Sequence, residues 1–265
     1  CEGATGVSVL KAVRGRDREF YSCIRSYAAQ EYPEFELLFA VRDLGDPAVA
    51  DIRRLAAEFP NRRIVVFPAE REWGPNPKVN GLERLRGEAR YPVLVVSDSD
   101  IRVERNYLQR VVGELADPEV GMVTCPYRGV AGGGLPSLLE ALWISTDFQA
   151  SVLVARWLGV QFALGATMAF RREDLDKIGG FAPLAAYLAD DYWLGNKIHG
   201  LGRRIALSGC VVETVLPQEG WRDSARHRVR WGRTLRVCRP AGYVGALITF
   251  AVPLAIAGVA AAPGL

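Results

Sequence analysis

Short apolar runs of strand length recur along the first hundred residues and alternate with segments of helical character. They predict strands at residues 7–13, 36–41, 64–67 and 93–96. Asp17 is expected to cap a helix after the first strand, and Asp46, followed by proline, a helix after the second. A rigid loop at residues 73–80 leads into a third helix. This alternation predicts an α/β fold with a mainly parallel sheet.

The second half of the chain is less regular. Strands are expected at residues 121–126 and 165–170, with short helices at 172–178 and 189–199. The segment 135–158 is long, apolar and rich in aromatic residues. It predicts one or two helices packed on the sheet or on a membrane surface. No internal repeat or low-complexity linker interrupts the sequence, so it does not divide into two independent domains.

Two acidic residues follow directly after the buried strand Val93–Val96. Asp98 and Asp100 are separated by one serine, so a bend there could turn both carboxylates toward one ion. Ligands bind at the carboxyl ends of strands in open α/β sheets, and oxygen ligands suit Mg²⁺ or Mn²⁺. The alternative is an ordinary strand that runs into a polar turn.

A second acidic pair, Asp190 and Asp191, stands at the start of the predicted helix that ends near His199. Negative charge is favourable at a helix N-terminus, so simple capping explains this pair as well as a catalytic role does. The pair is therefore a candidate site whose role the local pattern leaves open.

Composition narrows the class of protein. The chain has 265 residues, 49% of them hydrophobic and 24% charged, which fits a folded domain with a full core. A net charge of +3 gives no overall signal for nucleic-acid binding, and no nucleic-acid partner is expected. The five cysteines are scattered without metal-ligand spacing, which indicates reduced thiols, a cytosol-facing domain and no zinc.

Positive charge is instead concentrated near the C-terminus. Residues 221–239 hold a dense arginine run with Trp221 and Trp231, and residues 243–262 carry no charge at all. That apolar length, about twenty residues, matches one membrane crossing, and arginines are favoured on the cytoplasmic side. The alternatives are a solvated basic face and a buried core helix.

Taken together, the motifs resemble one family. An acid after the second strand is followed in order by Asp98-Ser99-Asp100, Asp190-Asp191-Tyr192-Trp193 and His227-Arg228-Val229-Arg230-Trp231. This order resembles membrane glycosyltransferases with three aspartate motifs and a terminal (Gln/Arg)-x-x-Arg-Trp. It is most similar to ceramide glucosyltransferases and to bacterial hopanoid-pathway glycosyltransferases. Further residues that support the resemblance are Gly6–Lys11, Asp46–Ala48 and Asn76–Asn80.

The resemblance implies a GT-A fold over residues 1–220, a Rossmann-like, mainly parallel sheet with helices on both faces. A basic interfacial helix at 221–240 and a transmembrane segment at 241–265 would follow. The implied nucleotide-sugar-binding residues are Asp43, Asp46, Lys78, Asp98, His227, Arg228, Arg230 and Trp231. Either Asp43 or Asp46 would contact uridine. His227 stands where the family has Gln or Arg. The adjacent Arg228 could substitute for that residue, or His227 could itself contact the diphosphate.

By the same resemblance, Asp98 and Asp100 would bind Mg²⁺ or Mn²⁺, and Asp191 would be the general base. The implied reaction is inverting transfer of a hexose, glucose or N-acetylglucosamine, from a UDP-sugar to a lipid alcohol. The acceptor would be ceramide-like or a hopanoid, at the cytoplasmic face of an inner membrane. The alternatives are a processive polysaccharide synthase, a nucleotidyltransferase and a non-catalytic, membrane-anchored nucleotide-binding module.

Overall fold

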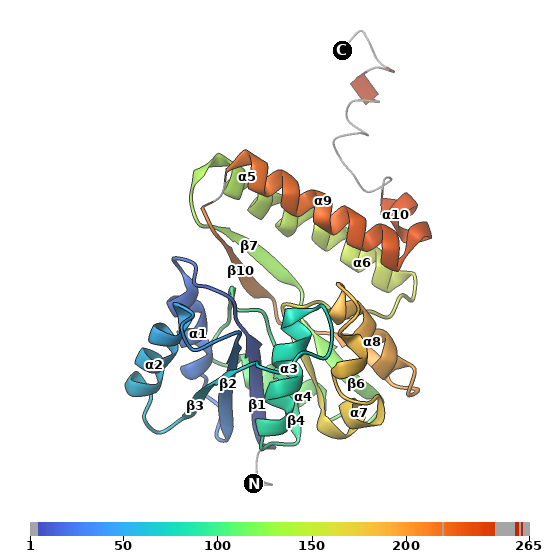
Figure 1. Ribbon diagram of the computed structural model, residues 1–265. Coiled ribbons are helices and arrows are strands. Elements are labelled where there is room, and N and C mark those ends of the chain that lie inside the picture. The colour runs from blue at the N-terminus through green and yellow to red at the C-terminus, as the bar shows by residue number, and fades with distance from the viewer. Residues whose placement is uncertain (1–4, 219, 247–257, 260, 262–265) are drawn as a thin grey trace.

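A seven-stranded sheet forms the centre of the computed structural model, which describes residues 5–218, 220–246, 258, 259 and 261 (Figure 1). In spatial order its strands are β3 (Arg63–Pro68), β2 (Phe35–Val41), β1 (Val7–Ala12), β4 (Val93–Val96), β8 (Met168–Arg171), β6 (Val120–Thr124) and β9 (Arg204–Leu207). Every pairing is parallel except those of β8, which runs antiparallel to both of its neighbours. The predicted mainly parallel sheet is confirmed.

Helices cover both faces of this sheet. One face carries α1 (Phe20–Ala28), α2 (Ala48–Glu58) and α4 (Tyr107–Glu114); the other carries α3 (Pro77–Glu88), α7 (Arg172–Lys177), the short η2 (Ala182–Leu184) and α8 (Asp190–His199). Successive strand residues point to opposite faces, so Val9 and Leu10 of β1 are fully buried in two different apolar clusters. Burial on both faces explains why the strands read as continuous apolar runs.

Of the two predicted helix caps, Asp46 caps its helix and Asp17 does not. Asp46 accepts a hydrogen bond from the amide of Ala48, the first residue of α2, at 2.9 Å, as a capping residue does. The expectation for Asp17 was wrong. Helix α1 begins at Phe20, and Asp17 contributes only its backbone carbonyl, which accepts from the Phe20 amide. Residues 18 and 19 form a turn that separates Asp17 from the first helical residue, Phe20, whose ring is buried in the core.

A second, three-stranded sheet was not predicted. It consists of β5 (Ile101–Arg102), β10 (Val212–Leu216) and β7 (Tyr127–Ala131), with β10 in the middle. Strand β5 begins directly after Asp100, and the amide of Val215 in β10 donates to the Asp100 carbonyl at 2.9 Å. The small sheet therefore extends the structure from the carboxyl end of β4.

Two long helical segments lie side by side beyond the small sheet (Figure 1). The first joins α5 (Gly134–Trp143), the π-helical turn η1 (Ile144–Phe148) and α6 (Gln149–Trp157), which confirms helix over residues 135–158. The second is α9 (Trp221–Cys238), followed by α10 (Pro240–Ala246). Most of the predicted transmembrane segment at 241–265 lies outside the described residues. Within the described part of the chain, one helix, Gly134–Trp157, is long and apolar enough to cross a membrane.

Candidate active site

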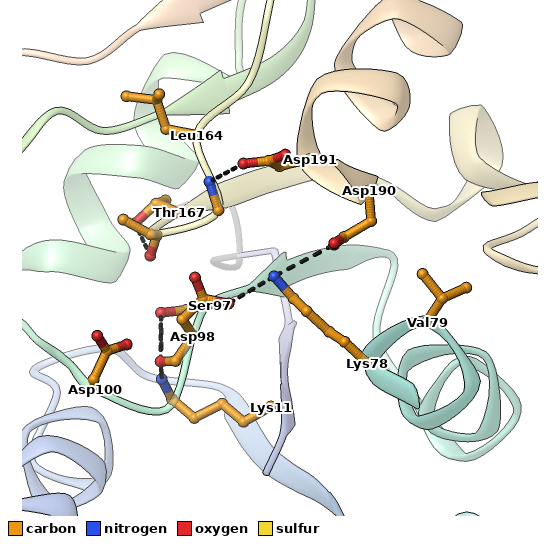
Figure 2. Close-up of polar contacts among 12 residues, drawn as sticks. Lys11, Lys78, Val79, Ser97, Asp98, Asp100, Leu164, Thr167, Asp190 and Asp191 are labelled. Carbon is orange, nitrogen blue, oxygen red and sulfur yellow. Dashed lines mark hydrogen bonds and ion pairs between the residues drawn. The ribbon is translucent and has the colours of Figure 1, made fainter. Parts of the chain in front are cut away.

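The two predicted acidic motifs converge on one lysine. Asn76 accepts hydrogen bonds from the amides of Lys78 and Val79, and this cap fixes Lys78 in the first turn of α3. The Lys78 ammonium lies 2.6 Å from Asp98 Oδ1, after β4, and 3.3 Å from Asp190 Oδ2, at the start of α8 (Figure 2). Asp98 and Asp190 are far apart in the sequence, and the fold brings their carboxylates together at the carboxyl edge of the sheet.

Asp191 faces the same point and is held by backbone amides. Its Oδ2 accepts from the Gly165 amide at 3.0 Å, and its Oδ1 accepts from the Tyr192 amide at 2.7 Å. A Cβ placed on Gly165 would lie 3.0 Å from Asp98 Oδ2 and 3.3 Å from Asp191 Oδ2. Gly165 therefore keeps the space between the two motifs open. No local sequence pattern singles out this glycine.

Electrostatics prepare Asp191 to accept a proton. Burial raises the pKa of Asp191 to about 6, with a further upward contribution from Asp190, while the Lys78 ammonium lowers it. Burial lowers the pKa of Lys78 itself, but Asp190, Asp98 and Asp191 together raise that pKa well above its usual range. A carboxylate with a pKa near neutrality beside a fixed cation has the properties of a general base.

Asp98 and Asp100 together can hold part of a cation site. Burial raises the pKa of Asp100, and the neighbouring Asp98 carboxylate raises it further, so a divalent ion would relieve the pair. Asp100 Oδ2 is oriented by the hydroxyl of Thr214, which donates to it at 2.8 Å. Among the described residues, no three His, Cys, Asp or Glu side chains converge to hold a metal. The remaining ligands would be phosphate oxygens and water, as is usual for Mg²⁺.

A buried lysine supports the turn that carries these acids. Lys11, at the carboxyl end of β1, is 1% exposed and donates to the Asp98 carbonyl at 2.8 Å and to Ser97 Oγ at 3.2 Å. Its ammonium also lies 3.7 Å from the centre of the Tyr27 ring. Burial lowers the pKa of Lys11 to about 7. Sequence analysis missed this residue, although a single lysine in an apolar strand was a visible signal.

The two acids expected on the uridine side lie apart from this cluster. They follow β2, which is separated from β4 by β1. Asp46 uses both oxygens on backbone, accepting from the amides of Gly15 at 2.8 Å and Ala48 at 2.9 Å. Asp43 is exposed; its Oδ1 accepts from the Gly45 amide at 2.9 Å, and its backbone carbonyl accepts from the Asp46 amide. Asp46 thus shapes the loop, and Asp43 has the freer carboxylate.

The residues of the terminal motif divide between two sides of α9. His227 Nδ1 pairs with Glu140, a buried acid of α5 that sequence analysis did not single out. The Trp231 ring lies 5.5 Å from Trp143 and 5.2 Å from Phe148, and the Arg228 guanidinium lies 4.8 Å from the Trp143 ring. The side chains of His227, Arg228 and Trp231 therefore attach α9 to the α5–η1 helix.

Arg230 points elsewhere. It lines a groove of about 670 Å³ beside Leu188, the residue two positions before Asp190. The other lining residues are Arg222, Ala225, Arg226, Val229 and Arg233. Four arginines line this groove, but most of its surface is apolar and comes from residues such as Leu188 and Val229 and from the arginine stems.

Sequence comparison finds ceramide glucosyltransferases among the relatives of this chain. Ceramide glucosyltransferase 1 of Caenorhabditis elegans is 30% identical over 205 residues, which are 77% of this chain and 44% of that protein. The ceramide glucosyltransferase of Candida albicans is 33% identical over 119 residues, 40% of this chain and 22% of that protein. The chain thus spans less than half the length of these curated relatives.

Solved structures agree on the fold. The mannosyltransferase PcManGT of Pyrobaculum calidifontis, solved with GDP-Man and Mn²⁺, superimposes with a TM-score of 0.69 at 22% identity, covering 99% of this chain and 76% of that one. Staphylococcus aureus TarS 1–349, solved with UDP-GlcNAc, superimposes with a TM-score of 0.56 at 18% identity, covering 88% of this chain and 65% of that one. The fold is GT-A, as the sequence predicted. Residues 1–265 match glycosyl transferase family 21, and the chain belongs to this family.

Proposed function

We propose that the protein is an inverting glycosyltransferase that moves a hexose from a UDP-sugar to a lipid alcohol at a membrane surface. The observation that carries this proposal is the meeting of Asp98, Asp190 and Asp191 around Lys78 at the carboxyl edge of the sheet. A single candidate base stands opposite a cationic and acidic diphosphate site. A single direct displacement, in which one base activates the acceptor hydroxyl, inverts the configuration at the anomeric carbon.

The leaving group is a nucleoside diphosphate, whose growing negative charge must be stabilised as the glycosidic bond breaks. In this proposal Lys78 and the exposed arginine Arg230 would supply positive charge to the diphosphate. Asp98 and Asp100 would hold Mg²⁺ or Mn²⁺ bound to the diphosphate, and that ion would offset its charge. The Mn²⁺ bound with GDP-Man in the Pyrobaculum structure supports this assignment.

The acceptor hydroxyl loses its proton as it attacks. Asp191 is held in one orientation by two amides and has a pKa of about 6, so it is mostly ionised at neutral pH and able to take that proton. Asp190 is paired with Lys78 instead, which argues for a supporting role. The capping interpretation of these two acids explains neither the contact with Lys78 nor the contact with Gly165.

A lipid acceptor and a membrane location are supported by the outer helices. The helix Gly134–Trp157 buries Ala141, Ile144 and Val152 against the domain, so one face is already occupied. Its outward face is apolar and exposed at Leu135, Leu138, Leu142, Leu153 and Trp157. Helix α9, which holds the arginine run, lies alongside (Figure 1). An apolar stripe beside a basic helix favours a segment that lies in the plane of a membrane with anionic lipids.

Ceramide glucosyltransferase relatives favour glucose as the sugar and a ceramide-like acceptor. N-Acetylglucosamine and a hopanoid remain the second choices, and an inner membrane with a cytoplasmic catalytic domain is the proposed location. The test is incubation of membranes that hold the full-length protein with labelled UDP-glucose or UDP-N-acetylglucosamine, followed by mass spectrometry of extracted lipids. A new glycolipid with an inverted linkage is expected. UDP binding without any transfer product would favour the non-catalytic binding module.

A further inference from the structure

Glu140 is a buried acid on an otherwise uncharged helix. It is 3% exposed, and α5 holds no other charged residue. Its carboxylate pairs with Nδ1 of His227 on α9, and no other described side chain pairs with it. A carboxylate only accepts hydrogen bonds, so Nδ1 carries the hydrogen and donates it. Because a buried charge without a partner is costly, this contact joins the two helices at one point.

The neighbouring contacts between the same helices are mainly aromatic. The Trp231 ring, one turn after His227, lies against Trp143 and Phe148 of the α5–η1 helix. Apolar packing is not directional, so it allows one ring to shift past another. A hydrogen bond weakens steeply when its angle changes. The Glu140–His227 contact therefore restricts the rotation of α9 about its axis more tightly than the aromatic contacts do.

That rotation decides where Arg230 points. Successive helix residues lie about 100° apart, so Arg230 stands about 60° from His227 and about 100° from Trp231 around the axis. Arg230 therefore lines the groove beside Leu188, while the other two side chains face the α5–η1 helix. Side-chain ends lie about 6 Å from the helix axis, so a rotation of about 20° would move Arg230 by about 2 Å. A hydrogen bond to a phosphate does not survive such a shift.

We infer that Glu140 is a positioning residue for donor binding. It holds His227 and thereby keeps Arg230 directed at the diphosphate of the nucleotide sugar. This inference rests on the proposed function, in which Arg230 supplies charge to that diphosphate. It also gives His227 a role that the family resemblance did not imply, because His227 would act by donating to Glu140 and not by touching the donor.

The first test replaces His227 in the full-length protein and measures kcat/KM for the UDP-sugar and binding of UDP with Mn²⁺. Parent transfer with UDP-glucose or UDP-N-acetylglucosamine is measured before the variants, and its absence would count against the proposed function itself. A glutamine amide can still donate to Glu140, so His227→Gln should stay within about twofold of the parent. Leucine cannot donate, so His227→Leu should lower kcat/KM and UDP affinity about tenfold, the effect of losing one charged hydrogen bond at Arg230. The acceptor KM should not change.

The double variant Glu140→Leu/His227→Leu separates positioning from stability. It leaves neither member of the buried pair without a partner, so its thermal unfolding temperature should recover from the low values of the single leucine variants. Apolar contact does not restore the rotation of α9, so kcat/KM for the donor should stay about tenfold low. Arg25→Leu/Glu58→Leu removes an ion pair of 2.6 Å between α1 and α2 and is the matched control, which should keep parent kinetics.

Addition of Arg230→Ala to the double variant links the effect to that arginine. Alone, Arg230→Ala should weaken UDP binding about tenfold, but in the double leucine background it should cost almost nothing further. Recovery of donor kinetics together with stability in the double variant would overturn the inference. So would additive losses with Arg230→Ala, parent-strength UDP binding by Arg230→Ala alone, or equal defects in His227→Gln and His227→Leu.

Discussion

Lys78 and Asp98 form an ion pair in which Nζ lies 2.6 Å from Oδ1. The pair joins the start of α3 to the carboxyl end of β4, and the same ammonium reaches Asp190 of α8. A lysine in this position keeps two acidic motifs together despite their mutual repulsion. It also leaves a cation next to the place where a diphosphate would bind.

The cation site can be tested by removing either acid. Asp98→Asn and Asp100→Asn should each weaken divalent-cation-dependent binding of UDP without unfolding the domain, because each removes one of the two carboxylates. Calorimetric titration with UDP in the presence and absence of Mn²⁺ measures this. Asp117→Asn, an exposed acid paired with Arg204, is the control. UDP and Mn²⁺ binding at parent strength in both variants would place the metal elsewhere.

The pH dependence follows from the pKa of Asp191. The base must be ionised to act, so kcat/KM should fall as pH drops below about 6, the pKa of the Asp191 carboxyl. The Asp190 carboxylate raises that pKa and the Lys78 ammonium lowers it. Asp190→Asn should therefore move the acidic limb of the profile to lower pH, and Lys78→Gln should move it to higher pH. An acidic limb that neither substitution moves would contradict this assignment.

Apolar runs made six of the seven strands of the central sheet predictable, because strands buried on both faces leave a strong local pattern; β9 (Arg204–Leu207) was not predicted. Val93–Val96 and the acids after it are the clearest example. The small sheet was missed because β5 has only two residues, and because Arg128 in β7 and Glu213 in β10 interrupt the apolar pattern. Lys11, Gly165 and Thr214 acquire their roles only through contacts between distant segments, which no local spacing records.

The membrane surface predicts an effect of charge on lipid binding. Charge reversal at Arg222 and Arg226 should lower binding of the protein to anionic liposomes by about tenfold or more, since each basic residue near such a surface contributes about 1 kcal/mol. Binding to neutral liposomes should change little. Arg53→Glu, on the exposed side of α2, serves as the matched control. Equal binding of all variants to anionic liposomes would remove the support for this surface.

Arg230 and Arg228 should behave differently despite standing on one helix. Arg230 lines the groove beside Leu188, so Arg230→Ala should raise the donor KM or lower kcat. Arg228 stacks on Trp143, and Arg228→Ala should mainly lower the thermal unfolding temperature. Steady-state kinetics with varied UDP-sugar, together with thermal unfolding, separate the two effects. Unchanged kinetics for Arg230→Ala would exclude a role for the groove in donor binding.

The central claim is that Asp191, and not Asp190, is the general base. Its most direct test is single-turnover transfer to the lipid acceptor with saturating donor, for Asp191→Asn and Asp190→Asn. Loss of a positioned base costs about 10²–10⁴-fold, so Asp191→Asn should slow transfer by that range while UDP affinity stays nearly intact. Asp190→Asn should cost less, because it breaks only the pairing with Lys78. Normal transfer by Asp191→Asn together with an inactive Asp190→Asn would contradict the assignment and exchange the roles of the two acids.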